Sequence, residues 1–226
     1  MTSQLEAINI NQKANGQNSI GEGVGMKVIA ATQNMHKIKE IKAITEPLGF
    51  EIISRADAGI SDFEIEEDGD TFEENSLKKA LSIHEICGLP TIADDSGLMV
   101  DALGGAPGIR SARFAGEEGN DAKNNGKLVE FLKDVPNEKR TGRFVSVITM
   151  VFSRDDIIVA KGECLGHIMY EVSGENGFGY DPLFAPMGYG VSFGNLPTEL
   201  KNSISHRARA LKILKYKLEQ RGLLNE

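Results

Sequence analysis

Short apolar runs alternate with helically spaced apolar residues from about residue 26 onward. Residues 27–31 and 50–54 are β-rich runs that predict two strands. Between them, four apolar side chains recur at helical spacing: Ile38, Ile41, Ile44 and Leu48. Pro47 and Gly49 mark the end of this helix. A strand–helix–strand unit of this kind favours an α/β fold.

Further along the chain, the same two patterns predict three more helices and four more strands. The helices are expected over residues 71–86, 121–133 and 205–220. The strands are expected over residues 90–93, 143–152, 157–163 and 166–171. Thr71 and Glu74 have the spacing of a capping box at the start of the first of these helices. We find neither an internal repeat nor an interdomain linker in the sequence, so residues 26–226 are expected to form one domain.

The composition indicates an ordinary globular protein. Of the 226 residues, 40% are hydrophobic and 26% are charged, a balance typical of soluble domains. Residues 1–25 are rich in Asn, Gln, Gly and Ser and predict a flexible N-terminal extension. No apolar run approaches the roughly 20 residues of a membrane helix, and the first residues lack a signal peptide. We therefore expect a cytoplasmic protein without a membrane partner.

The formal net charge of −8 limits the partners further. A general nucleic-acid-binding protein needs an electropositive face, so no nucleic-acid partner is expected. A small polyanionic substrate is not excluded, because a divalent cation and a few local Lys and Arg can reverse the field in a cleft. Cys87 and Cys164 lie far apart without metal-ligand spacing, which predicts reduced thiols and not a zinc site.

Residues 32–37 form the first candidate site. The segment reads Thr32, Gln33, Asn34, Met35, His36 and Lys37, and it connects a predicted strand to a predicted helix. Helix N-termini present free N–H groups and a partial positive charge, which suits phosphate. The segment lacks a Walker-type pattern, so an ordinary capping turn with a solvated lysine is the alternative.

Carboxylates form the second candidate site. Asp94 and Asp95 follow the apolar strand predicted over residues 90–93, and Glu66 and Glu67 lie in an acidic loop. Adjacent carboxylates are costly to bury unless a cation or hydrogen bonds compensate, and Mg²⁺ prefers such oxygen ligands. A metal-associated carboxylate can also orient or deprotonate a water molecule. A solvated acidic loop is the alternative for the two glutamates.

Two further candidates lie near the C-terminus. Residues 174–182 place Phe178 and Tyr180 among glycines, with Asp181 as an acceptor for N–H groups of a base. A tight hairpin with two packing rings is the alternative. Lys201 and Arg207 lie where the last helix begins, which suits an anion between them, whereas a solvated basic helix face is the alternative.

In this order, the segments closely resemble the inosine triphosphate pyrophosphatase family, enzymes that act on dITP, ITP and XTP. The resemblance covers the chain from about Met26 to the C-terminus. The matching stretches are VIAATQNMHK, TFEENSLKKA, ADDSGLMVDALGGAPGIRSARFAG, NGFGYDPLF and SHRARAL. The third and fourth stretches are together highly specific. The resemblance implies an α/β fold with an elongated mixed central sheet flanked by helices, and two lobes with the active site in the cleft between them.

The resemblance also implies roles for individual residues. Asp95 matches the family's general base and Mg²⁺ ligand, and Glu66 matches a second metal-associated carboxylate. The implied substrate-binding residues are Thr32, Gln33, Asn34, Met35, His36, Lys37, Ser96, Phe178, Gly179, Tyr180, Asp181, Lys201, His206 and Arg207. Family members are typically homodimers that use Mg²⁺ and release the nucleoside monophosphate and pyrophosphate. The family usually has glycine in place of Gln33, and its acidic loop varies in length, so Glu67 remains an alternative to Glu66.

Overall fold

The computed structural model describes residues 26–61, 63, 65–117 and 119–224, so the predicted extension over residues 1–25 lies outside this part of the chain. Its strands form one mixed sheet in the order β2-β1-β3-β4-β5-β6. Their bounds are β1 (Met26–Ala30), β2 (Phe50–Ser54), β3 (Thr91–Val100), β4 (Thr141–Ser153), β5 (Asp156–Ile168) and β6 (Phe184–Pro186). β1 is parallel to β2 and β3, and the other neighbours are antiparallel. The predicted mixed α/β sheet is confirmed.

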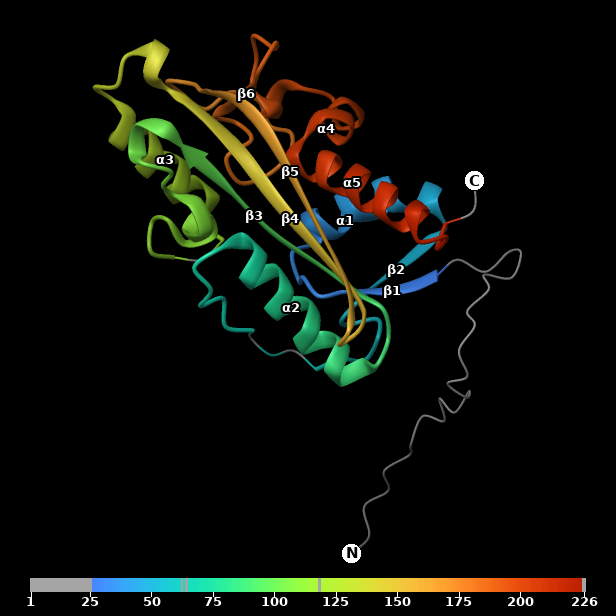
Figure 1. The fold of residues 1–226 in the computed structure, drawn as a ribbon. Helices are drawn as coiled ribbons and strands as arrows, with labels where there is room; N and C mark the ends of the chain where they lie inside the picture. The colour runs from blue at the N-terminus through green and yellow to red at the C-terminus, as the bar shows by residue number, and fades with distance from the viewer. Residues whose placement is uncertain (1–25, 62, 64, 118, 225–226) are drawn as a thin grey trace, which may run out of the picture.

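Helices cover both faces of this sheet (Figure 1). Within the described residues they are α1 (Met35–Thr45), α2 (Phe72–Cys87), α3 (Asp121–Leu132), α4 (Thr198–Ile204) and α5 (His206–Gln220). The predicted capping box at Thr71 and Glu74 is present at the start of α2. α2 lies on one face of the long strands, and α1 and α5 lie on the other (Figure 1). None of the helices described here is long and apolar enough to cross a membrane.

Buried apolar side chains gather at both ends of the long strands. Toward one end, Ile148 of β4 belongs to a cluster with Leu211 and Leu214 of α5. Toward the other end, Phe144 of the same strand belongs to a cluster with Leu128 of α3. The long strands therefore carry packed apolar clusters toward both ends, and α2 packs against further clusters on the other face of the sheet.

β3 has alternating faces that decide the geometry of the site. Ile92 packs in the cluster of α1 and α5, whereas Ala93 packs with Ala80 and Ile83 of α2. Side chains along a strand point alternately to opposite faces of the sheet. β3 continues past Ala93, so the next two residues, the adjacent aspartates, are directed to opposite helical layers.

The structure departs from several of the predicted elements. The strand predicted over residues 90–93 runs on as β3 to Val100, because ion pairs and hydrogen bonds compensate its buried carboxylates. The strands predicted over residues 157–163 and 166–171 are one strand, β5, because Gly166 pairs in the sheet without a break. α4 was not predicted, because its seven residues bury only Lys201 and show no clear apolar period.

Strands β1 and β3 separate shortly after they begin to pair. β1 pairs with β3 only at Ile29–Thr91 and Ala30–Ile92, after which β3 continues and β1 gives way to the loop that enters α1. The carboxyl end of β1 and the middle of β3 are thus left facing each other across an opening. In α/β sheets, ligands commonly bind at the carboxyl ends of strands where neighbouring chains diverge.

Candidate active site

The loop of residues 32–37 is fixed by its own side chains. Asn34 caps α1: its Oδ1 accepts hydrogen bonds from the backbone N–H of His36 at 2.9 Å and of Lys37 at 3.2 Å. Thr32 Oγ1 accepts a hydrogen bond from the backbone N–H of Asn34 at 3.1 Å. The loop is therefore held at a helix N-terminus, where the helix dipole favours an anion.

Four residues of this loop line a polar cavity of about 240 Å³: Thr32, Gln33, Asn34 and Lys37. The other two predicted contacts point elsewhere. Met35 is 58% exposed, and the ring of His36 stacks on Phe178 with centroids 5.2 Å apart. The stack joins the predicted phosphate-binding loop to the segment predicted to recognise the base.

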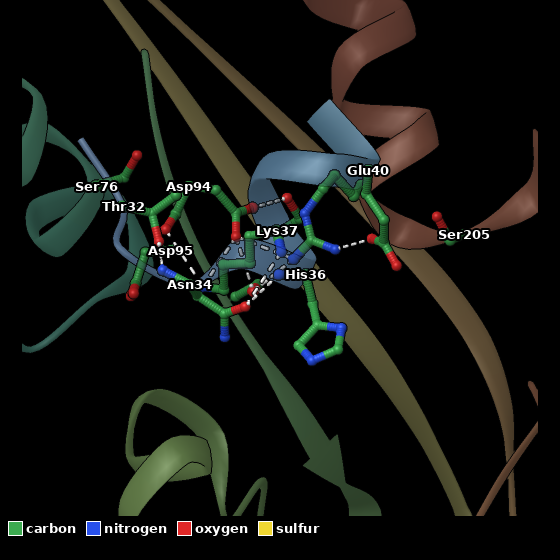
Figure 2. A network of polar contacts seen from close by, with 12 residues as sticks. Thr32, Asn34, His36, Lys37, Glu40, Ser76, Asp94, Asp95 and Ser205 are labelled. Carbon is green, nitrogen blue, oxygen red and sulfur yellow. Dashed lines mark hydrogen bonds and ion pairs between the residues drawn. The ribbon is translucent and has the colours of Figure 1, made fainter. Parts of the chain in front are cut away.

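Asp94 is a buried anchor for two cations (Figure 2). Its Oδ2 lies 2.9 Å from Lys37 Nζ and 3.0 Å from Arg207 Nη2. The hydroxyls of Ser96 and Ser146 donate further hydrogen bonds to its carboxylate. Burial by itself would raise the pKa of Asp94, but Arg207 and Lys37 hold this pKa well below its usual range. Asp94 is therefore ionised and fully engaged.

Asp95 is oriented away from that network, to the side of α2 (Figure 2). Its Oδ1 lies 2.7 Å from Lys79 Nζ, and its Oδ2 is buried without a hydrogen-bond partner among the described residues. Burial raises the pKa of Asp95, the charge of Glu67 adds to this effect, and Lys79 and Lys37 oppose it. A carboxylate with a raised pKa and a free oxygen is a good proton acceptor.

The structure separates the two neighbouring glutamates of the acidic loop. Glu66 is exposed and is not part of the cavity lining. Glu67 lines the cavity and lies 3.2 Å from Lys79 Nζ through Oε1. Burial would raise the pKa of Glu67, but Lys79 and Lys37 lower it overall. The geometry therefore favours Glu67, the alternative in the sequence analysis, over Glu66 as a partner of Asp95.

A second cavity, of about 120 Å³, adjoins the polar one and is more aromatic. Both cavities are lined by the same four residues at their junction: Asn34, Lys37, Ser96 and Ala112. All four residues of the predicted base-recognition segment line the second cavity: Phe178, Gly179, Tyr180 and Asp181. This segment lies in the loop between the antiparallel neighbours β5 and β6. An aromatic recess thus opens beside a charged one.

Asp181 organises the base-recognition segment. Its Oδ2 accepts a hydrogen bond from the backbone N–H of Phe178 at 2.8 Å and lies 2.5 Å from Lys201 Nζ. A Cβ at Gly177 would lie 2.1 Å from this Oδ2, and Gly177 has a φ of +79°, so only glycine fits there. Asp181 therefore shapes the loop, and its contact with a base stays a prediction.

The segment is also tied to the opposite wall of the aromatic cavity. The backbone N–H of Gly179 donates to Asp121 Oδ2 at 2.7 Å, and Asn125 Nδ2 donates to the carbonyl of Gly179 at 2.8 Å. Tyr180 Oη donates to the carbonyl of Ser111 at 2.9 Å. α3 and the turn before it thereby fix the width of the cavity.

The basic residues at the start of α5 are connected to α1 through Glu40. This buried carboxylate pairs with Lys201 Nζ at 2.7 Å and with Arg207 Nη1. His206 is also buried, its ring stacks on Phe144, and its Nδ1 has no hydrogen-bond partner among the described residues. Burial and neighbouring cations lower the pKa of His206, so its ring is neutral. All three predicted residues, Lys201, His206 and Arg207, line the aromatic cavity.

Sequence reasoning missed several charged residues of the site. Lys79 and Glu40 lie on the inner faces of α2 and α1, where a charged residue among apolar ones was the available signal. Arg113 follows the glycine-rich turn, and its Nη2 donates to the carbonyl of Glu67 at 3.1 Å. Each acts through a partner that is distant in sequence, which local patterns do not reveal.

The chain matches known proteins over most of its length. The family model described as the Ham1 family matches residues 28–217. A protein of Haemophilus influenzae named dITP/XTP pyrophosphatase is 51% identical over 194 residues, which are 85% of this chain and 98% of that protein. A protein of the same name from Escherichia coli O157:H7 is 44% identical over 190 residues, 83% of this chain and 95% of that protein.

Solved structures agree with the sequence matches. The Staphylococcus aureus Ham1 protein superposes with a TM-score of 0.76 at 39% identity, covering 86% of this chain and 99% of its own. A HAM1 protein from Coxiella burnetii gives a TM-score of 0.77 at 34% identity, with 86% and 99% covered. The resemblance inferred from the motifs is confirmed, and the chain belongs to the Ham1 family.

Proposed function

We propose that the protein hydrolyses non-standard purine nucleoside triphosphates, namely dITP, ITP and XTP, to the nucleoside monophosphate and pyrophosphate, and so removes them from the nucleotide pool. The observation that carries this proposal is the junction of the two cavities. The polar cavity combines the carboxylates of Asp95 and Glu67 with the cations Lys37 and Lys79. The adjoining aromatic cavity has the size and lining for a base. The relatives named dITP/XTP pyrophosphatase support the substrate class.

The donor set fits a magnesium ion. Asp95 Oδ2 is a buried oxygen without a partner among the described residues, and the Glu67 carboxylate approaches the same ammonium group, Lys79 Nζ. Among the described residues, no group of three or more His, Cys, Asp or Glu side chains is placed to hold a metal ion, so the protein would supply only the carboxylates of Asp95 and Glu67. Mg²⁺ commonly takes one or two carboxylates and completes its shell with water and substrate phosphate. When bound, it would supply charge neutralisation for the phosphates.

Within the proposal, each charged residue of the polar cavity has a separate role. Lys79 holds Asp95 Oδ1, so Oδ2 is left to accept a hydrogen bond from water and direct that water at the α-phosphorus. The raised pKa of Asp95 makes this carboxylate a stronger proton acceptor. Lys37 and the N-terminus of α1 stabilise the negative charge of the departing pyrophosphate.

Removing one glutamate should distinguish the two candidate metal ligands. Glu67→Gln is expected to raise the Mg²⁺ concentration for half-maximal activity by about tenfold or more, because one charged ligand is lost. Glu66→Gln, the matched control on the exposed neighbour, is expected to change it less than about twofold. Activity is titrated with Mg²⁺ at saturating ITP. A larger effect at Glu66 would restore the assignment made from the family resemblance.

A substrate panel tests the proposed function itself. Pyrophosphate release is measured with ITP, dITP, XTP, GTP and ATP, each with Mg²⁺ and with an excess of chelator. ITP, dITP and XTP carry a 6-oxo acceptor, whereas adenine carries a 6-amino donor there. An unmatched buried polar group costs about 1–3 kcal/mol, so ATP is expected to react about 10- to 100-fold more slowly. GTP shares the 6-oxo group and must be rejected at its 2-amino group. Equal rates for all five substrates, or activity that survives the chelator, would contradict the proposal.

A homodimer and a cytoplasmic location complete the proposal. The homodimer is what the family resemblance implies, and a cytoplasmic location suits an enzyme that acts on the nucleotide pool. Size-exclusion chromatography with light scattering would give twice the 24.5 kDa chain mass for a dimer. Cell fractionation would show where the protein is located. A monomeric mass would overturn the proposed homodimer, and recovery in the membrane fraction would overturn the proposed cytoplasmic location.

A further inference from the structure

Arg55 is a buried arginine to which the sequence motifs assign no role. It follows β2 directly, is only 5% exposed, and lines the polar cavity together with Thr32, Lys37 and Lys79. Arg55 thus lies at the end of the edge strand of the sheet, next to β1, which leads into the loop before α1. Arg55 is therefore a buried charge in the polar cavity that has no role in the proposed hydrolysis.

The contacts of Arg55 satisfy its hydrogen bonding only in part. Nη2 donates to the carbonyls of Ser61 at 3.2 Å and Phe63 at 3.0 Å, and Cζ lies 4.5 Å from the centre of the Phe63 ring. Nε is buried without a hydrogen-bond partner among the described residues. None of the ion pairs between described residues includes Arg55. Neutral carbonyls do not balance a guanidinium charge, which is costly to bury alone. No described carboxylate pairs with Arg55, so its guanidinium is available to an anionic ligand in the cavity.

The order of the elements across the sheet indicates which anion fits. The aromatic cavity lies toward β4 and α5, where Phe144 and Arg207 line it. The two cavities meet at Lys37 and Ser96. Arg55 lies on the other side of that junction, at the end of β2, which is the edge strand next to β1. A nucleotide with its base in the aromatic cavity would thus extend its terminal phosphates toward Arg55.

We propose that Arg55 contacts the terminal phosphates of the substrate and holds the pyrophosphate product after cleavage. The proposal rests on the proposed function, since it assumes that the triphosphate occupies the polar cavity. A planar guanidinium can form two parallel hydrogen bonds to phosphate oxygens. Its contacts with the carbonyls of Ser61 and Phe63 orient this fork and also hold the loop that carries Glu67.

The test compares the two products as ligands. Inorganic pyrophosphate and IMP are titrated into the full-length protein with Mg²⁺ by calorimetry and are also measured as inhibitors of ITP hydrolysis. The variants are Arg55→Gln, Arg55→Lys and Arg154→Gln. Arg154 is a matched control, because it is an exposed arginine paired with Glu85 and is absent from both cavity linings. Thermal unfolding of each variant checks that the fold is retained.

Arg55→Gln is expected to weaken pyrophosphate binding by about 10- to 100-fold, the usual effect of losing a charged hydrogen-bond donor. Binding of IMP should change less than about twofold, because the monophosphate does not reach Arg55. Arg55→Lys should lie between wild type and Arg55→Gln, because it keeps the charge and loses the fork.

Two results would overturn the proposal. One is pyrophosphate binding by Arg55→Gln within twofold of wild type. The other is an equal loss of IMP and pyrophosphate binding, which would mean that Arg55 only supports the loop. Failure of the proposed function looks different: wild-type protein would release no pyrophosphate from ITP. Binding of pyrophosphate that depends on Arg55 would support the contact even then.

Discussion

Replacing Asp95 by Asn is expected to lower kcat by about two to four orders of magnitude, the usual contribution of a general base. Asparagine keeps the shape of the side chain but loses the buried oxygen that would accept a proton from water. Burial raises the pKa of Asp95, so a neutral side chain relieves a cost at this position, whereas the loss of the pair with Lys79 opposes this gain. Lys79 keeps Glu67 as a partner, so the free energy of unfolding should change much less than kcat. Steady-state kinetics and urea unfolding of the same preparation measure both effects.

The control for this prediction is Asp155→Asn. Asp155 is an exposed carboxylate in the turn between β4 and β5. The Asp155→Asn substitution should leave both kcat and the free energy of unfolding within error of wild type. Near-normal turnover by Asp95→Asn would remove Asp95 from the mechanism. Loss of turnover accompanied by unfolding would assign it a structural role instead.

The second large effect is expected on stability, at Asp94. Asp94→Asn should lower the free energy of unfolding by about 3–5 kcal/mol, because it leaves the buried cations Lys37 and Arg207 without a shared partner. Activity should fall as well, since both cations line the cavities. Urea unfolding monitored by circular dichroism measures the loss, again with Asp155→Asn as the control. A stability close to wild type would show that the network is not coupled to folding.

The pH dependence of this loss has a defined sign. The pKa of Asp94 is lowered by folding, so the stabilisation by its carboxylate is complete above the ordinary carboxyl value of 3.8. The stabilisation is lost as the pH falls through the lowered pKa of the folded state. The difference in stability between wild type and Asp94→Asn should therefore be constant near neutral pH and shrink only in acid.

Much of the fold could be predicted because its signals are local. β2 was predicted with the bounds that it has, and the capping box of α2 is a contact between Thr71 and Glu74, three residues apart. The length of β3 could not be predicted, because two adjacent aspartates are normally a sign of exposed chain. Lys79 and Arg207, from helices on opposite faces of the sheet, allow these carboxylates to be buried.

The candidate site shows the same limit. Its motifs were recognisable, and most predicted residues line the two cavities. The choice between Glu66 and Glu67 depends on which side of an irregular loop faces Lys79, and irregular backbone carries no period from which a direction can be read. Asp94 and Asp95 look alike in sequence, yet their opposite pKa shifts arise from the alternating faces of one strand.

The position of the attacking water tests the central claim most directly. ITP is hydrolysed with Mg²⁺ in water enriched in ¹⁸O, and the products are separated and analysed by mass spectrometry. If the residues of the polar cavity direct water at the α-phosphorus, the label will be found in IMP, and the pyrophosphate will be unlabelled. Label in pyrophosphate, or release of IDP and inorganic phosphate, would contradict the account.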